Sequence, residues 1–360
     1  MKRYVIAAAF LLPVLAISCK QPAPAEEAKE ASPRKIKNII FMVGDGMGTT
    51  QIYAGLTANK GSLNLERFKC IGFSRTNSAS NYMTESAAGA TAFSIGQKTY
   101  NGAIGVDSAG NPQPTILEIA KQHGLSTGIV VTTDITDATP ATFAAHQKQR
   151  EMQAEIAADY IKSDVDVLIG GGREHFDQRK DGRNLLTEFV QKGYQVKHTT
   201  ADVEQVKQGK LIGLIKEERV AVRGDQLART ANAALQLLQQ NKKGFFLVVE
   251  GSKIDDGGHA NDLQYVTEEV IDFDKAIKAA LDYAEKDGET LVIVTADHET
   301  GGLTIAEGDL KTGKISGKFS TDDHTGVMVP VFAYGPGAEA FMGIYHNNAI
   351  FRKFMEALKF

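Results

Sequence analysis

The sequence predicts an α/β protein in which a central, mainly parallel sheet lies between two layers of helices. Six short apolar runs, each suited to a buried strand, alternate with longer stretches that have the periodicity of amphipathic helices. Such alternation is typical of a three-layer sandwich whose sheet is covered on both faces. Acidic and histidine residues also follow directly after several strands, where open parallel sheets bind their ligands.

The elements can be placed in chain order. The predicted strands cover residues 38–43, 126–132, 165–169, 245–249, 290–295 and 328–334. The predicted helices cover residues 115–123, 151–161, 183–191, 226–240, 266–285 and 348–358. Residues 173–225 have weaker periodicity, which indicates a peripheral elaboration. No strong linker follows residue 36, so residues 36–360 are predicted to form one domain.

Composition and charge limit the possible partners. The chain has 360 residues, of which 42% are hydrophobic, and its formal net charge is -4. The apolar content is sufficient for a sizeable core. The weak negative charge gives no support to a nucleic-acid partner.

The first residues are predicted to be a targeting sequence. Lys2 and Arg3 precede an apolar stretch, residues 4–15, that is short for a membrane span. The run LAISC at residues 15–19 resembles a bacterial lipoprotein signal, which is cut before the cysteine so that lipid can be attached to its thiol. An ordinary secretory signal with an incidental cysteine is the alternative.

We therefore expect a signal peptide over residues 1–18, followed over residues 19–35 by a disordered tether that is lipid-anchored through Cys19. The tether is rich in Ala, Glu, Pro and Lys, a composition typical of disordered segments. The protein is expected to be exported to the periplasm or cell envelope and to contact a membrane only through this anchor.

The run TESAAGATAF at residues 84–93 is predicted to form the first turns of a helix, with Ser86 near its start. Small side chains allow a ligand to approach the backbone closely. The free N–H groups and positive dipole of a helix N-terminus suit a phosphate. On this run alone, a buried helix of small residues with a solvent-facing serine is the simpler interpretation.

Two glycine-containing segments indicate metal ligands. The run GDGMG at residues 44–48 is not a dinucleotide-binding loop, because Thr49 stands where G-x-G-x-x-G needs its last glycine. Asp45 in this loop favours a metal-binding carboxylate, and a simple glycine turn is the alternative. In the run EGSKIDDGGH, Asp255 and His259 are four residues apart, so one helical turn places both on one face.

Carboxylate and imidazole together suit zinc better than calcium or magnesium. Glu250, at the end of a predicted strand, suits a harder cation. Asp297-His298 and Asp323-His324 add two further Asp/His pairs, which favour a metal centre over isolated structural histidines. An arginine such as Arg150 near these metals would hold a phosphate with two hydrogen bonds, although a lone arginine is more often a surface charge.

Taken together, these motifs resemble those of bacterial alkaline phosphatases. They occur in one order from residue 38 to residue 360: FMVGDGMG, TESAAGATAF, TDATPATFAAHQKQR, VVEGSKIDDGGHAND, TLVIVTADHETGG and DDHTG. The resemblance implies that small phosphate monoesters are hydrolysed to an alcohol and inorganic phosphate, which also inhibits as product. It further implies two Zn²⁺ ions and one Mg²⁺ ion as cofactors.

The resemblance also implies a role for each site residue. Ser86 would be the nucleophile that becomes a phosphoserine, and Arg150 would grip two phosphate oxygens. The implied ligands are Asp255, His259 and His324 for the first zinc, Asp45, Asp297 and His298 for the second, and Asp45, Thr139 and Glu250 for magnesium. Asp137 would orient a water on the magnesium. The chemistry agrees, because a serine hydroxyl is a weak nucleophile that metal coordination activates.

Three features depart from the pattern of the family. Glu85 precedes Ser86 where many relatives have aspartate, and it is the residue expected to dock Arg150. Asp256 stands where some relatives carry Lys or His, which removes a water-mediated contact to phosphate. Residues 298–324 are few where animal relatives insert a crown domain, so dimerisation through such an insertion is not expected and the oligomeric state stays open.

Other functions stay open on the sequence alone. A phosphodiesterase of the same superfamily often uses threonine and lacks the third metal, and Thr139 and Glu250 speak against it. A sulfatase would need a C/S-x-P-x-R context, which Ser86 lacks. A catalytically dead lipoprotein that binds metal or phosphate would be expected to have lost a ligand or the nucleophile.

Overall fold

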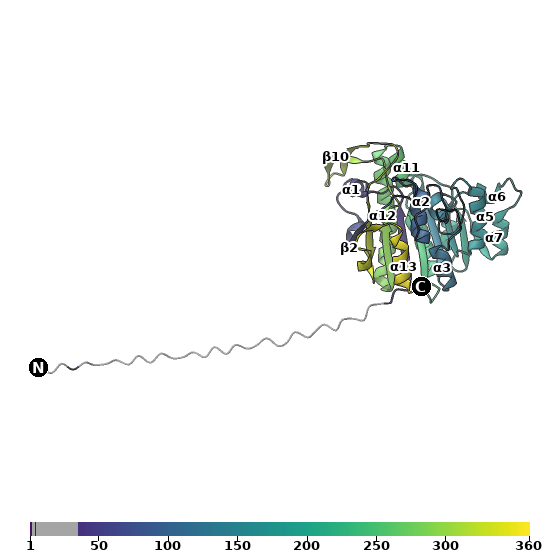
Figure 1. The fold of residues 1–360 in the computed structure, drawn as a ribbon, viewed down its shortest axis with the longest axis horizontal. Coiled ribbons are helices and arrows are strands. Elements are labelled where there is room, and N and C mark those ends of the chain that lie inside the picture. The colour runs from purple at the N-terminus through teal and green to yellow at the C-terminus, as the bar shows by residue number, and fades with distance from the viewer. Residues whose placement is uncertain (2–3, 5–34) are drawn as a thin grey trace. The chain divides into compact units, whose positions relative to one another are not determined.

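A computed structural model describes residues 1, 4 and 35–360 (Figure 1). Apart from residues 1 and 4, the predicted signal peptide lies outside the described residues, as does the lipid anchor predicted at Cys19. Within the part of the chain that the structure describes, no helix is both long and apolar enough to cross a membrane.

A ten-stranded sheet with the order β14-β2-β13-β8-β1-β7-β3-β4-β6-β5 forms the centre of the fold. The strands are β1 (Asn38–Gly44), β2 (Cys70–Arg75), β3 (Ser126–Asp134), β4 (Val167–Gly171), β5 (Tyr194–Lys197), β6 (Lys210–Leu214), β7 (Phe245–Gly251), β8 (Thr290–Thr295), β13 (Val329–Tyr334) and β14 (Gly343–His346). Within this sheet β13 runs antiparallel to both of its neighbours, and the other pairs are parallel. The predicted mainly parallel sheet is confirmed.

Helices cover both faces of the sheet (Figure 1). The longer ones are α1 (Thr49–Ala58), α2 (Ser86–Ile95), α3 (Ile116–Gln122), α5 (Gln153–Ser163), α7 (Leu185–Gln191), α10 (Gln226–Leu238), α12 (Leu263–Asp287) and α13 (Ala349–Leu358). The other helices are α11 (Lys253–His259), α4 (Ala138–Ala141), α6 (Glu174–Asp177), α8 (Thr200–Gln205), α9 (Val220–Arg223) and the 3-10 turns η1 (Asn64–Arg67) and η2 (Ala338–Phe341).

The two faces correspond to two apolar cores, and alternation along β1 divides them. Phe41 belongs to the core under α2, α3, α5 and α13, where its ring meets those of Phe93 and Phe354 at centroid distances of 5.3 and 5.1 Å. Met42, the next residue, belongs to the core under α10 and α12. All of β1 is buried, which explains its uninterrupted apolar sequence.

Two small antiparallel ribbons lie within residues 299–325. They are β10 (Thr304–Asp309) with β11 (Lys314–Lys318), and β9 (Glu299–Thr300) with β12 (His324–Thr325). The second ribbon pairs His324 with Thr300 and so returns a distant histidine to the end of β8.

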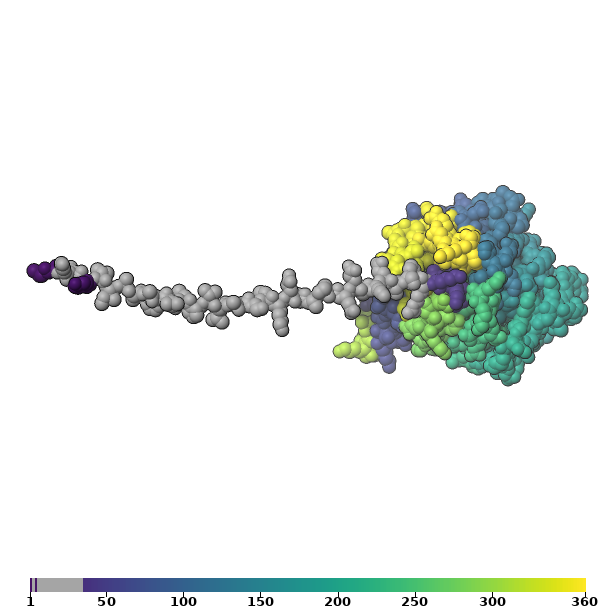
Figure 2. Space-filling view, turned by 90° about the horizontal axis from the view of Figure 1, so that it is seen from below, coloured from purple at the N-terminus to yellow at the C-terminus, as the bar shows by residue number. Residues whose placement is uncertain are grey.

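Each predicted strand and helix is present, with boundaries shifted by a few residues. Treating residues 173–225 as peripheral was wrong in part, because β5 and β6 extend the main sheet. The strands β14, at the edge of the sheet, and β2, beside it, were not predicted, since both are short and partly exposed and lack a continuous apolar run. Figure 2 shows the C-terminal segment in yellow beside the purple start of the folded part, and Ile36 there packs against Gly337.

Candidate active site

Adjacent strands bring the acidic residues of the site together. The strands β8, β1, β7 and β3 are neighbours and run parallel, so their carboxyl ends share one edge of the sheet. Asp45 directly follows β1, Glu250 lies near the end of β7, and Asp297 follows β8. Asp137 lies in the loop after β3. A cavity of about 200 Å³ opens at this edge, and Asp45, Ser86, Asp137 and Arg150 line it.

The loop after β1 needs glycine to fit around the site. Gly46 has a φ of +70°, and a Cβ atom there would lie 2.7 Å from Thr300 Oγ1 and 2.9 Å from the Cα of Asp255. A side chain at this position would therefore push β1 away from α11. The GDG run therefore allows the end of β1, with Asp45, to lie close to α11.

Ser86 is the first residue of α2, and its side chain is buried in the cavity wall. Glu85 caps the helix by accepting hydrogen bonds from the backbone N–H groups of Ala87 and Ala88 at 2.9 and 2.7 Å. Such a cap satisfies donors that a helix N-terminus otherwise leaves free. The Ser86 Oγ atom lies 3.3 Å from His298 Nε2, so the helix start meets the end of β8.

Arg150 is held between two carboxylates. Its Nη1 donates to Glu85 Oε2 at 2.9 Å and its Nη2 to Asp137 Oδ1 at 3.0 Å. Burial alone would lower the pKa of Arg150, but the carboxylates of Asp137 and Glu85 raise it, so the guanidinium stays charged. Glu85 thus contacts Arg150 although it is longer than the aspartate of many relatives.

His298 is the centre of one group of possible metal ligands, those expected to hold the second zinc. Its Nε2 lies 3.4 Å from Asp45 Oδ1 and 3.3 Å from Asp297 Oδ2, in addition to the contact with Ser86 Oγ. Asp297 and His298 are fully buried. Neither Asp45 Oδ1 nor Asp297 Oδ2 has a hydrogen-bond partner among the described residues.

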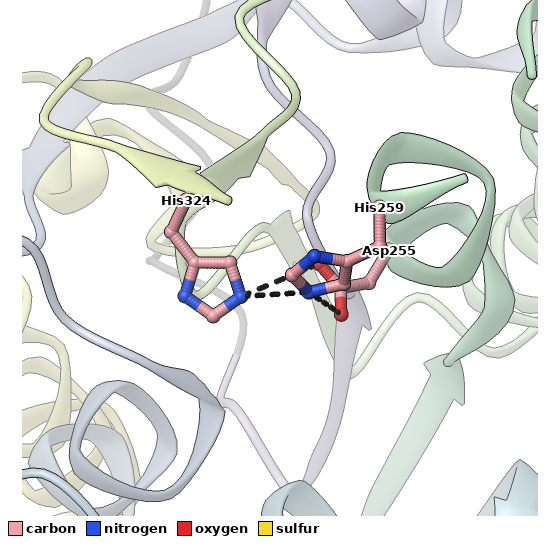
Figure 3. A group of neighbouring side chains, drawn as sticks. All are labelled: Asp255, His259 and His324. Atoms are coloured by element: carbon pink, nitrogen blue, oxygen red, sulfur yellow. Dashed lines mark hydrogen bonds and ion pairs between the residues drawn. The ribbon is translucent and has the colours of Figure 1, made fainter. Parts of the chain in front are cut away.

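Asp255, His259 and His324, the residues expected to hold the first zinc, form another group of possible metal ligands (Figure 3). Asp255 and His259 come from α11, and their side chains meet at 3.2 Å between Oδ2 and Nε2. His324 comes from β12 and points its Nε2 at that of His259, also at 3.2 Å, and at Asp255 Oδ1 at 3.7 Å. Figure 3 shows the ring of His324 beside that of His259, with the Asp255 carboxylate next to both.

The hydrogen bonds of these two histidines favour metal coordination. The Nδ1 of His259 lies 2.6 Å from the carbonyl oxygen of Asp322, and that of His324 lies 2.9 Å from the carbonyl oxygen of Thr84. Carbonyls only accept, so each Nδ1 carries a proton and each ring, once Nε2 has given up its proton, presents a lone pair at Nε2 to a metal. Two lone pairs that face each other fit a cation between them, and with Asp255 they form a donor set suited to zinc.

A third set of buried oxygens lies deeper. Thr139 Oγ1 and Glu250 Oε2 are buried and have no hydrogen-bond partner among the described residues. Burial, followed by the charge of Asp137, raises the pKa of Glu250, and burial with the neighbouring Asp297 raises that of Asp45. Buried carboxylates that crowd in this way fit a cation, and oxygen donors suit magnesium.

Some residues near the predicted motifs take other places. His146 does not join the cavity: its Nδ1 contacts the carbonyl oxygen of Gly105 at 2.8 Å and its Nε2 contacts Glu118 Oε1 at 3.1 Å. Lys253 and Asp256, three residues apart on α11, also line the cavity and were not among the predicted site residues. A further group, Asp134, Glu174 and His175, lies beside the ends of β3 and β4 and was not predicted.

Comparisons with known proteins agree with this geometry. A family model described as alkaline phosphatase matches residues 36–318. Alkaline phosphatase 4 of Bacillus subtilis is 35% identical, over 95% of this chain and 96% of that protein. The alkaline phosphatase of Escherichia coli is 31% identical, over 91% and 87%.

Solved structures give the same result. The structure of alkaline phosphatase from the Antarctic bacterium TAB5 superposes with a TM-score of 0.86, is 40% identical, and covers 91% of this chain and 99% of that chain. A mutant of the TAB5 alkaline phosphatase, described with Mg bound in its M3 site, also has a TM-score of 0.86.

Proposed function

The chain belongs to the alkaline phosphatase family and is a hydrolase of phosphate monoesters, and we propose that it acts through a phosphoserine formed on Ser86. The observation that carries the proposal is the meeting of Ser86 Oγ with His298 Nε2 at 3.3 Å, in the cavity that Arg150 also lines. A nucleophile, two groups of possible metal ligands and a fixed guanidinium thus converge on one place.

We propose that the site holds two Zn²⁺ ions and one Mg²⁺ ion. The residues that would hold them are Asp255, His259 and His324 for the first zinc, Asp45, Asp297 and His298 for the second, and Asp45, Thr139 and Glu250 for magnesium, with Asp137 beside the last. The unpartnered buried oxygens support these assignments, as does the Mg-bound TAB5 relative. Such cations, when bound, supply Lewis acidity to phosphoryl and hydroxyl oxygens.

In the proposed reaction Arg150 binds two oxygens of the phosphoryl group and holds phosphorus in line with Ser86 Oγ. The bond from Oγ to phosphorus forms as the bond from phosphorus to the alcohol oxygen breaks, and the alcohol leaves with a proton. Water then cleaves the phosphoserine, which releases inorganic phosphate and restores the Ser86 hydroxyl. Because phosphate makes the same contact with Arg150, it inhibits as product.

The test is a side-by-side assay of the metal-loaded protein on an aryl phosphate, a bis-aryl phosphate and an aryl sulfate. Hydrolysis of the monoester far above the other two is expected. A higher rate on the diester would instead favour the phosphodiesterase alternative, and no turnover of any substrate would favour the dead-site alternative. The unpartnered Thr139 and Glu250 oxygens, suited to a third metal, support the monoesterase.

We further propose that the protein is exported and held at a membrane by lipid on Cys19. The support is the sequence of residues 1–19, whose charged start, apolar stretch and LAISC run have the pattern of a lipoprotein signal. More than one acyl chain on Cys19 would anchor the protein stably, since each buried CH₂ contributes about 0.8 kcal/mol.

A further inference from the structure

The mouth of the cavity carries an ionic group of its own. Lys253 Nζ lies 3.0 Å from Asp256 Oδ2 and is also bonded to Glu217 Oε1. Lys253 and Asp256 belong to α11 and line the cavity together with Ser86, whereas Glu217 comes from the segment before α9. This group contains none of the proposed metal ligands.

The two signs of charge in this group are placed unequally with respect to solvent. The side chain of Lys253 is 8% exposed, whereas those of Asp256 and Glu217 are 52% and 35% exposed. A molecule that enters therefore meets the carboxylates before the ammonium group. Arg219, a cation close by, stacks over the Tyr265 ring at 3.7 Å from its centroid. Arg219 and Lys253 together balance the two carboxylates, but the carboxylate side chains are the exposed members of the Lys253–Asp256–Glu217 group.

Asp256 is held in place with one oxygen free. Lys253 and the Tyr265 hydroxyl both donate to its Oδ2, at 3.0 and 3.3 Å. Its Oδ1 accepts no hydrogen bond from the described residues. An acceptor fixed in this way binds a donor without the cost of ordering its side chain, and a charged donor forms the stronger bond.

We propose that Asp256 selects phosphate monoesters whose alcohol part carries a cationic group, such as an ammonium, which Asp256 Oδ1 binds. The inference rests on the proposed function, because Asp256 lines the same cavity as Ser86 and Arg150, so the alcohol part of an ester bound there would lie within its reach. Glu217 acts as a positioning residue, since it holds Lys253 and Lys253 holds Asp256.

The experiment compares 2-aminoethyl phosphate with propyl phosphate, which have nearly the same size and differ in charge. Both are assayed at pH 8 with the full chain loaded with zinc and magnesium. We expect kcat/KM to be higher for the aminoethyl ester, and Asp256→Asn to lower the ratio of the two kcat/KM values about two- to fivefold, as for a partly exposed ion pair. The change should lie in KM, because the contact is equal in ground and transition states.

Glu356→Gln is the matched control. It removes one negative charge from α13, which lies near the bottom of the folded part in Figure 1 whereas α11 lies near its top, and it should leave the ratio unchanged. Asp256→Glu, which keeps the charge, should retain part of the preference. An unchanged ratio in a folded Asp256→Asn variant would overturn the proposal.

Salt provides a measurement that needs no variant. The wild-type ratio should fall as ionic strength rises, because screening weakens an exposed ionic contact, and Asp256→Asn should show a smaller fall. A ratio of one at low salt, or a ratio that salt does not change, contradicts the proposal even if Asp256→Asn fails to fold. If wild type hydrolyses both esters without preferring the aminoethyl ester, only the proposed selectivity is wrong. If it hydrolyses neither ester, the proposed function itself is contradicted.

Discussion

The Nε2 atoms of His259 and His324 lie 3.2 Å apart, although the two residues are 65 positions apart in the chain. Each ring donates a hydrogen bond from Nδ1 to a backbone carbonyl, which leaves the Nε2 atoms of the two rings to face each other as possible metal ligands. A cation between the rings would bind both nitrogens, and the removal of metal should therefore have large effects.

Treatment with a chelator is expected to abolish phosphatase activity, and zinc with magnesium is expected to restore it. The melting temperature should also fall, because an ion bound at 1,000 times its Kd stabilises the folded state by about 4 kcal/mol. Elemental analysis, activity and thermal unfolding on the same samples check this. Full activity in protein shown to be free of metal would rule the metal sites out.

A matched pair of histidine variants separates the site from general stability. His324→Ala should lower the bound zinc and reduce activity by at least about a hundredfold, since even changes beside a metal ligand cost ten- to a hundredfold. His146→Gln, which alters a similarly buried histidine outside the cavity, should keep the zinc content of wild type. Equal zinc in both variants would contradict the assignment of His324.

His146 itself predicts a pH dependence of stability. Burial alone would lower the pKa of His146, but the bonds with Glu118 and with the carbonyl of Gly105 raise it. Both ring nitrogens face acceptors, which favours the imidazolium. Because the folded pKa is raised, this contribution is complete below the ordinary histidine pKa of about 6.5 and is lost as pH rises through the folded value.

Urea unfolding of wild type and His146→Gln should therefore differ more at pH 6 than at pH 9. The extra difference in unfolding free energy should be up to about 1 kcal/mol, as for a partly exposed pair. Glu118→Gln should remove the same pH dependence, because it removes the partner. The same difference at both pH values would show that folding does not raise the pKa of His146.

The sequence predicted which side chains lie together at the sheet edge better than it predicted the outer strands of the sheet. Runs such as residues 38–43 and 290–295 are buried on both faces, so their strands are visible as continuous apolar segments. Motifs that follow such strands must meet at one edge of the sheet, which is why Asp45 and Asp297 could be grouped. By contrast, β14 has an exposed and mixed sequence, and only its pairing with β2 makes it a strand.

Contacts between segments far apart in the chain were beyond the sequence. The ion pair between Lys253 and Glu217 joins α11 to a segment that contains no motif, so the sequence of neither segment predicts it. The contact between Glu85 and Arg150 likewise depends on the path of the loop before α5. That path places the guanidinium where the Glu85 carboxylate reaches it.

The anchor can be tested through Cys19. Cys19→Ser removes the thiol that lipid attachment requires, so the protein should be released from membranes or remain unprocessed, with the catalytic domain intact. Fractionation of cells, followed by immunoblotting and a phosphatase assay, checks this. The wild-type protein in the same fractions is the control. Equal membrane retention of the variant would rule out lipid on Cys19.

Arg150→Ala is expected to weaken phosphate binding without preventing the covalent step. Loss of a charged contact with two hydrogen bonds costs about 1.5–3 kcal/mol, or roughly ten- to a hundredfold in affinity. Inhibition by inorganic phosphate should weaken in parallel with the rise in KM, because product and substrate share the contact. A change in kcat alone, with phosphate inhibition as in wild type, would contradict this role.

Ser86→Ala is expected to abolish the phosphoenzyme that wild type and Arg150→Ala accumulate. At acid pH hydrolysis of the phosphoserine should slow, so that mass spectrometry of acid-quenched protein detects the intermediate. Some slow turnover can survive in Ser86→Ala, because water activated in the site can attack phosphorus directly. Residual activity therefore does not decide the matter, whereas the position of the phosphoryl group does. A phosphoryl group mapped to a residue other than Ser86 would overturn the proposed mechanism, even with the fold and the metals unchanged.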